Sequence, residues 1–167
     1  EQAICEYTGS KYAIAAVNGT SALHICLLLA GVKADEEVIT QPVSFIATCN
    51  AISYTGAKPV FVDVDRRTMG MSAEKLEDFL KENARKGADG FTYNNKTGRR
   101  FAAVVPMHTF GHPCDLDGIV EVCERYNIAL VEDSAESIGS YYKGKHTGLF
   151  GKLSALSFNG NKVITTG

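Results

Sequence analysis

Short apolar runs alternate with longer amphipathic stretches along most of this chain. The apolar runs predict six strands, near residues 12–17, 38–40, 59–62, 101–106, 128–131 and 155–158. The amphipathic stretches predict helices over residues 21–30, over 72–84 with Ser72 as the N-cap, and over 116–126. Repeated strand–helix units, without an internal repeat of fixed period, are typical of a mainly parallel sheet with right-handed crossovers. The pattern therefore predicts an α/β protein built as a three-layer α/β/α sandwich.

Residues 87–100 interrupt this pattern with a polar, glycine-rich stretch. Glycine and asparagine recur there and favour turns, so we expect an exposed loop or hairpin. Its basic side chains, Lys96, Arg99 and Arg100, are suited to a phosphate, but a solvated loop is the commoner explanation of such a charge run. We assign this stretch no functional role.

The composition narrows the class of protein. Of the 167 residues, 45% are hydrophobic and 22% are charged, which is enough apolar material for one core and indicates one domain. The net charge of −2 gives no general attraction to nucleic acid or to an anionic membrane, and no run approaches the roughly 20 apolar residues of a spanning helix. The five cysteines contain no Cys-x-x-Cys pair, which argues against a disulfide framework or a zinc ribbon. We expect a cytoplasmic protein that binds neither nucleic acid nor membrane.

Two predicted strand–helix junctions carry residues suited to a flat, phosphorylated ligand. Gly19, Thr20 and Ser21 stand where a helix begins, and backbone N–H groups at such a position favour a phosphate. An ordinary helix cap is an equal alternative there, because threonine and serine cap helices widely. Phe45 begins another helix close to a strand end, where its ring can stack on a flat cofactor; a core anchor is the alternative, and for a single aromatic residue the commoner one.

A lysine and a carboxylate follow two further predicted strands. Lys162 comes shortly after the strand predicted at 155–158, and Asp133 follows the one at 128–131. Open α/β sheets bind ligands at the carboxyl ends of their strands, so we expect both side chains at one edge. A lysine can form a Schiff base there, and a carboxylate can pair with a pyridine nitrogen. A phosphate site, a flat apolar face, a carboxylate and a lysine are together what pyridoxal phosphate requires.

His108 and His112 have the spacing of two metal ligands on a helix. Gly111 and Pro113 disfavour a helix at this point, and no acidic residue or thiol has matching spacing. We therefore reject a metal site. His108 lies in a loop after a predicted strand, where the alternatives are a place in the active site and a structural hydrogen bond, the second being favoured.

Five ordered segments carry a resemblance that runs along essentially the whole chain. They are GTSAL at 19–23, SFIATCNA at 44–51, PVFVDVD at 59–65, EDSAE at 132–136 and SFNGNKVITTG at 157–167. In these segments the sequence resembles the DegT/StrS-type nucleotide-sugar aminotransferases, a branch of the aspartate aminotransferase fold (fold type I) of pyridoxal phosphate enzymes. The resemblance implies a set of cofactor-binding residues: Thr20, Ser21, Phe45, Asp133, Glu136, Ser157 and Lys162.

The resemblance also implies a role for each of these residues. Thr20 and Ser21 would hold the phosphate together with Ser157, Phe45 would stack on the pyridine face, and Asp133 would meet the ring nitrogen. The catalytic residue would be Lys162, which binds the cofactor's aldehyde and later moves protons; the related sugar dehydratases have histidine there. Glu136 departs from the commoner glutamine, so that its role is open.

The implied reaction moves an amino group from an amino acid, with glutamate expected, to a keto group of a nucleotide-activated sugar in the synthesis of cell-surface polysaccharide or glycan precursors. Family members work as homodimers with a shared active site, so a second copy is an expected partner. Residues 1–167 would be part of the large cofactor-binding domain, a fragment lacking an N-terminal segment and a C-terminal small domain. The alternatives are a non-catalytic pyridoxal phosphate-binding or regulatory paralogue, and another fold type I enzyme acting on small amino acids.

Overall fold

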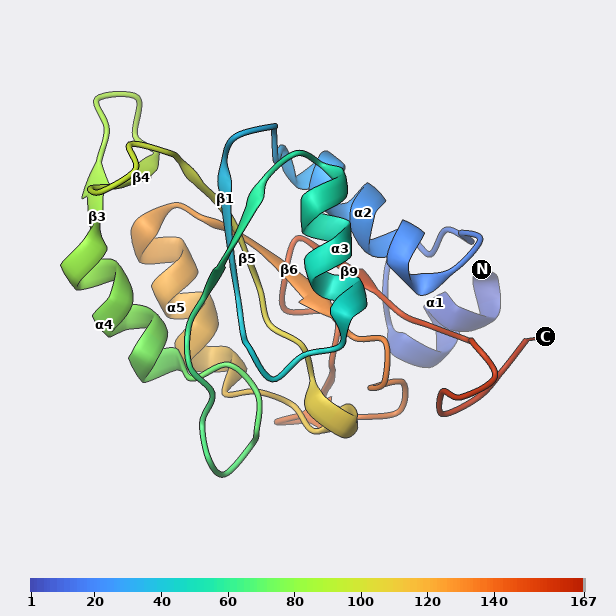
Figure 1. Ribbon diagram of the computed structural model, residues 1–167. Coiled ribbons are helices and arrows are strands. Elements are labelled where there is room, and N and C mark those ends of the chain that lie inside the picture. The colour runs from blue at the N-terminus through green and yellow to red at the C-terminus, as the bar shows by residue number, and fades with distance from the viewer. Residues whose placement is uncertain (167) are drawn as a thin grey trace.

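A five-stranded parallel sheet forms the centre of the computed structural model, which describes residues 1–166 (Figure 1). Its strands stand in the order β2 (Lys58–Phe61), β1 (Glu37–Thr40), β5 (Phe101–Val105), β6 (Ala129–Asp133) and β9 (Leu153–Ala155). Every residue of β1 and β5 is buried, as expected for parallel strands that are covered on both faces. Because all five strands are parallel, their carboxyl ends meet at one edge, the lower one in Figure 1.

Helices cover both faces of this sheet and complete three layers (Figure 1). One face carries α2 (Gly19–Ala30) and α3 (Ile46–Tyr54), and the other carries α4 (Ala73–Asn83) and α5 (Leu116–Tyr126). Each face has its own apolar core: one includes Leu23, Leu27 and Ile52, and the other includes Leu76, Leu80 and Ile119. The α/β/α sandwich predicted from the alternating pattern is therefore confirmed. A short helix, α1 (Gln2–Thr8), precedes these elements and was not predicted.

The predicted helix boundaries are close to the observed ones. The Ser72 hydroxyl accepts a hydrogen bond from the Lys75 N–H at 3.2 Å, so Ser72 caps α4 as expected. The α5 helix has the predicted range, and α2 begins at Gly19, two residues earlier than predicted. No helix within residues 1–166 is long and apolar enough to cross a bilayer.

The strand predicted at residues 12–17 is wrong. This segment is exposed coil, in which the side chains of Tyr12, Ile14 and Val17 are 74%, 84% and 87% exposed. A strand needs a neighbour with which to share its backbone hydrogen bonds, and in the described part of the chain the segment pairs with none. The last strand was also placed too late, because β9 ends at Ala155 and leaves Ser157 and Phe158 in the loop beyond it.

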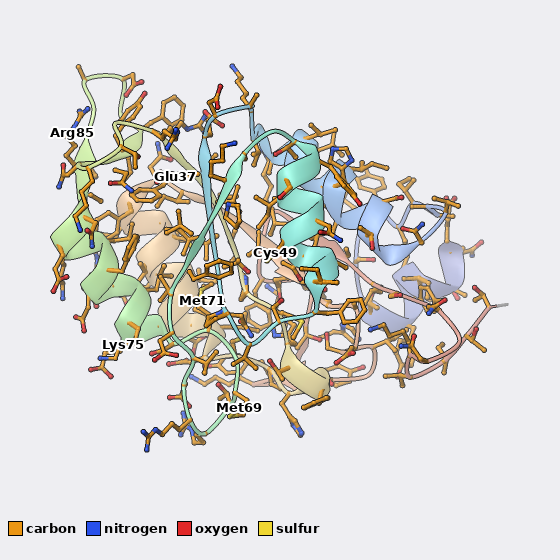
Figure 2. All side chains as sticks on the ribbon, in the orientation of Figure 1. Glu37, Cys49, Met69, Met71, Lys75 and Arg85 are labelled. Carbon is orange, nitrogen blue, oxygen red and sulfur yellow. The ribbon has the colours of Figure 1, made fainter. Side chains whose placement is uncertain are left out.

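The predicted loop or hairpin at 87–100 is a hairpin of β3 (Ala84–Lys86) and β4 (Thr92–Asn94). It is more firmly anchored than an exposed loop would be. The carboxylate of Glu37, 3% exposed, accepts hydrogen bonds from the Asn94 amide and the Thr97 hydroxyl, each at 2.8 Å. Figure 2 shows Glu37 and Arg85 at the same end of the molecule, away from Met69 at the other end. The hairpin therefore stands at the amino edge of the sheet.

The remaining elements are small and lie near the carboxyl edge. A single 3-10 turn, η1 (Thr109–Gly111), follows β5, and a two-stranded hairpin of β7 (Tyr141–Tyr142) and β8 (Lys145–His146) lies between β6 and β9. The five cysteines, Cys5, Cys26, Cys49, Cys114 and Cys123, are free thiols in this structure.

Candidate functional site

Lys162 lies in the loop after β9, with its side chain folded back over the sheet edge. Its Nζ atom is 2.9 Å from Oε1 of Glu136 and 5.3 Å from the centroid of the Phe45 ring. The side chain of Lys162 is only 9% exposed. The structure thus brings together three of the predicted site residues, from segments more than 25 residues apart in the sequence.

Phe45 stands at the N-cap position of α3, directly after the loop that follows β1. Its side chain is 57% exposed, so the ring is not a core anchor. Its backbone N–H donates to Sδ of Met107, which fixes the start of the helix against the end of β5. The open ring face beside Lys162 is a suitable surface for stacking a flat heterocycle.

Asp133 is the last residue of β6 and is 4% exposed. The Thr48 hydroxyl donates to its Oδ2 at 2.6 Å, and the Ala135 N–H donates to its Oδ1 at 3.2 Å. Burial raises the pKa of Asp133, and these two donors together with the charges of His108 and Lys162 oppose that effect only in part. A carboxylate offers about four acceptor positions, so this one has room for a further cationic N–H donor.

Thr48 was not recognised from the sequence as a site residue. It is fully buried on α3, one helical turn after Phe45, and its hydroxyl orients the carboxylate of Asp133 from 85 residues away. A lone threonine inside a predicted helix carries no chemical signal, although its spacing from Phe45 places both on the same side of α3.

The amino end of α2 lies against Ser157. A Cβ atom at Gly19 would lie 3.0 Å from Cβ and 3.1 Å from Oγ of Ser157, so a larger residue would crowd Ser157 and push it back by a few tenths of an ångström. The N-cap is Asn18, whose Oδ1 accepts from the Ser21 N–H at 2.8 Å. Neither Thr20 nor Ser21 is therefore the capping residue, and the alternative of an ordinary threonine or serine cap is wrong.

This helix end has the properties of an anion site. Within residues 1–166 the backbone N–H groups of Gly19 and Thr20 make no hydrogen bond. Unpaired N–H groups and the helix dipole both favour a dianion at such an end. Thr20 and Ser21 follow Gly19 in the first turn of α2, and the Oγ atom of Ser157 lies beside Gly19.

Behind Asp133 lies a buried pair of side chains that no motif in the sequence indicates. His108 and Glu132 are both fully buried, with Nε2 of the histidine 3.1 Å from Oε2 of the glutamate. Burial favours the neutral ring, but hydrogen bonds with Cys114 and Glu132 outweigh it and raise the pKa of His108 to about 9. For Glu132 burial favours the neutral acid, and the contacts with His108, Gly151 and Gly148 outweigh it and lower the pKa.

Glu132 also organises the loop that leads to β9. Its carboxylate accepts three backbone hydrogen bonds, from the N–H groups of Gly148 at 2.8 Å and of Phe150 and Gly151 at 2.7 Å each. Of the two alternatives for His108, the structural hydrogen bond is therefore the correct one. His112 is exposed and takes no part in this pair.

Glu136 faces Lys162 from the loop after β6. Besides its contact with the lysine, its Oε2 accepts a hydrogen bond from the Phe110 N–H at 3.2 Å. The carboxylate thereby joins the loops that follow β5, β6 and β9 at one point. An amide at this position would fill the same space without the charge.

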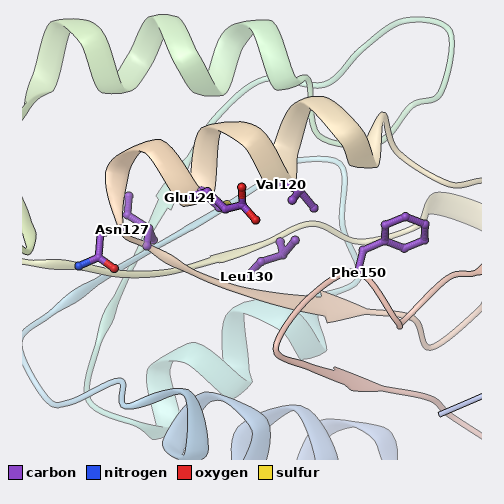
Figure 3. Close-up of a pocket in the computed structure, with 7 residues that line it drawn as sticks. Val120, Glu124, Asn127, Leu130 and Phe150 are labelled. Atoms are coloured by element: carbon purple, nitrogen blue, oxygen red, sulfur yellow. The ribbon is translucent and has the colours of Figure 1, made fainter. Parts of the chain in front are cut away.

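One hollow in the described part of the molecule lies away from these residues. It has a volume of about 240 Å³ and is lined by α5, by Leu130 of β6 and by Phe150 (Figure 3). It contains neither Lys162 nor Asp133, and it opens on the face of the sheet that α5 covers. We therefore place the candidate site at the carboxyl edge and not in this hollow.

Comparison with known proteins assigns the chain to a family. The model of the DegT/DnrJ/EryC1/StrS aminotransferase family matches residues 1–167. GDP-perosamine synthase of Caulobacter vibrioides is 41% identical over 167 residues, which are 100% of this chain and 40% of that protein. GDP-perosamine synthase of Escherichia coli O157:H7 is 42% identical, again over 100% of this chain and 41% of that protein. The chain thus spans about 40% of the length of these curated relatives.

Solved structures give the same result. An aminotransferase from Psychrobacter cryohalolentis superposes with a TM-score of 0.84 at 35% identity, over 100% of this chain and 38% of that one. NtdA from Bacillus subtilis, solved with the bound cofactor PMP, superposes with a TM-score of 0.79 at 28% identity, over 99% of this chain and 33% of that one. These likenesses confirm the expected α/β fold of the fold type I pyridoxal phosphate enzymes. By fold, by motif and by identity along its whole length, the chain belongs to the DegT/DnrJ/EryC1/StrS aminotransferase family.

Proposed function

We propose that this protein is a pyridoxal phosphate-dependent aminotransferase that moves an amino group from an amino acid to a keto group of a nucleotide-activated sugar. The observation that carries the proposal is the position of Lys162, whose nearly buried Nζ lies beside the open ring of Phe45. Family membership supports the same reaction class. Residues 1–167 would then form part of a large cofactor-binding domain.

The side chains at the sheet edge fit the cofactor. Pyridoxal phosphate, when bound, supplies an aldehyde that links to amines and a ring that withdraws electrons from the attached carbon. Lys162 would bind that aldehyde and carry the proton between the substrate carbon and the cofactor carbon. Asp133, which has room for another N–H donor, would hold a proton on the ring nitrogen. Phe45 would cover one face of the ring and exclude water from it.

The phosphate would bind at the amino end of α2. The unpaired N–H groups of Gly19 and Thr20 would donate to it, with the hydroxyls of Thr20, Ser21 and Ser157 around it. The close approach of Gly19 to Ser157 supports this role, because it brings two hydroxyl-bearing segments to one place.

The names of the relatives guide the choice of an acceptor sugar. Two of them are named for the synthesis of GDP-perosamine, so a GDP-linked keto sugar is the first acceptor to test. We propose glutamate as the amino donor, a homodimer as the working assembly and the cytoplasm as its location. The product would serve the synthesis of cell-surface polysaccharide or glycan precursors.

The test is an absorbance titration of the purified protein with pyridoxal phosphate, followed by addition of L-glutamate. We expect a visible Schiff-base band that glutamate bleaches, and loss of the band in Lys162→Ala. Adding a GDP-linked keto sugar should then restore the band and yield an aminated sugar by mass spectrometry.

One control variant and two alternative outcomes make the result interpretable. Lys33→Ala changes an exposed lysine and should leave the band intact. A protein that binds the cofactor but never responds to an amino donor would instead be a non-catalytic binding paralogue. A band that responds only to small amino acids, with no amination of a sugar, would point to another fold type I activity.

A further inference from the structure

The side chain of Lys162 is almost hidden from water, and among residues 1–166 its ammonium group contacts one carboxylate. The side chains of Lys162 and Glu136 are 9% and 29% exposed, and the two charged groups are 2.9 Å apart. The buried carboxyl of Asp133 also senses the charge of Lys162, but no direct contact joins them within residues 1–166. Burying an ammonium is costly unless a counter-charge accompanies it. Glu136 is therefore the group that allows Lys162 to lie in the site.

Glu136 is itself held by a donor that belongs to neither partner. The backbone N–H of Phe110 donates to Oε2, while Oε1 receives the lysine. Phe110 adopts a φ of 52°, which a bulky residue seldom does, and its ring is 84% exposed. The next residue, Gly111, is tightly packed, because a Cβ added to it would lie 2.6 Å from the carbonyl oxygen of Glu136. A backbone held in a rare conformation thus fixes the carboxylate that receives Lys162.

From this geometry we propose that Glu136 is a positioning residue for Lys162. Whenever Nζ is not bonded to the cofactor, the carboxylate keeps the ammonium beside Phe45 at the sheet edge. The lysine side chain then stays within reach of the aldehyde and does not rotate outward into the solvent. The negative charge, and not the shape of the side chain, is what performs this role. The proposal rests on the proposed function, in which Lys162 binds the cofactor.

The charge can be tested without the cofactor, through the chemical reactivity of Lys162. The cofactor-free protein is treated with limiting N-hydroxysuccinimidyl acetate, and acetylation of each lysine is measured by peptide mass spectrometry, with exposed Lys33 as the internal reference. A paired ammonium reacts slowly, so removing the charge should expose a reactive amine. We expect acetylation of Lys162 relative to Lys33 to rise roughly fivefold in Glu136→Gln, the factor expected for loss of one partly buried ion pair.

Matched variants separate the charge from the fold. Glu136→Asp keeps a negative charge and should retain most of the protection of Lys162, whereas Glu136→Gln keeps the shape and should not. Glu124→Gln makes the same chemical change at an exposed site on α5 and should leave the ratio unchanged. A ratio for Glu136→Gln that stays within about twofold of the unmodified protein would overturn the proposal, given the energy expected of such a pair.

A second measurement distinguishes failure of this proposal from failure of the proposed function. The rate at which the Schiff-base band forms with pyridoxal phosphate is compared between the unmodified protein and Glu136→Gln. A slower or incomplete band in the variant supports positioning, and equal rates contradict it. If no band forms in either protein, the proposed function fails, and the acetylation ratio alone decides whether Glu136 holds Lys162.

Discussion

Replacing Glu132 with glutamine should destabilise the fold severely, although the two side chains have nearly the same shape. The fully buried carboxylate accepts four hydrogen bonds: Oε1 receives those of Phe150 and Gly151, and Oε2 receives those of Gly148 and His108. A glutamine has one acceptor oxygen and one amino group, and the amino group can only donate. In either orientation of the amide, one pair of donors faces another donor.

The loss of unfolding free energy can be estimated from these hydrogen bonds. Two buried donors lose their partner, and each such loss costs about 1–3 kcal/mol. The bonds that remain are to a neutral oxygen and are weaker than bonds to a charged one. Breaking one member of a buried charged pair costs about 3–5 kcal/mol, which gives the same range by a different route. We therefore expect the free energy of unfolding to fall by about 4 kcal/mol.

Urea unfolding followed by far-ultraviolet circular dichroism measures this change. With a slope of about 2 kcal/mol per molar urea, the midpoint should fall by about 2 M. Glu82→Gln on the exposed side of α4 makes the same substitution where the described residues offer the side chain no hydrogen bond or ion pair, and should stay within about 0.5 kcal/mol. A loss for Glu132→Gln of less than about 1 kcal/mol would refute the reasoning, because the four bonds would then not hold in solution.

Three other predictions concern neighbouring groups. The pKa of His108 is raised from 6.5 to about 9, so the stability that its protonated ring contributes is complete below pH 6.5 and is lost as the pH rises through 9. The urea midpoint of unfolding should therefore fall between these pH values, and a flat or rising profile would contradict the raised pKa. Thr48→Val removes the hydroxyl that donates to Asp133 and should cost about 2 kcal/mol by urea unfolding, with an unchanged midpoint counting against the contact. Gly111→Ala places a Cβ 2.6 Å from the carbonyl oxygen of Glu136 at a φ of +82°, and should lower the free energy of unfolding in urea by more than about 1 kcal/mol. Gly98→Ala, whose Cβ would meet open space, should cost clearly less, and equal effects would refute the close approach.

Much of the sheet could be predicted from the sequence because most of its strands are short apolar runs between amphipathic helices. The same reasoning failed at residues 12–17, where the pattern is strand-like but the described sheet offers no neighbour. Strand propensity shows that a segment could join a sheet, but it does not show whether a neighbouring strand is there to pair with it.

The candidate site divides along similar lines. Phe45, Asp133 and Lys162 were predicted because each follows a strand, and strand ends converge in a parallel sheet. Thr48 and the pair of His108 and Glu132 act through contacts between distant segments, and nothing in their own neighbourhood marks them. The sequence could thus suggest which groups lie at the carboxyl edge of the sheet, but not which groups hold them in place.

The β3–β4 hairpin offers a practical site for labelling the protein. It is attached through Glu37 at the amino edge of the sheet, whereas Lys162 lies at the carboxyl edge. At its tip, Gly90 has a φ of +81°, and a side chain added there would meet open space. A fluorophore or an affinity tag inserted beside Gly90 should leave the anchoring bonds and the lysine undisturbed, so that binding of the proposed cofactor and sugar can be followed on an immobilised protein.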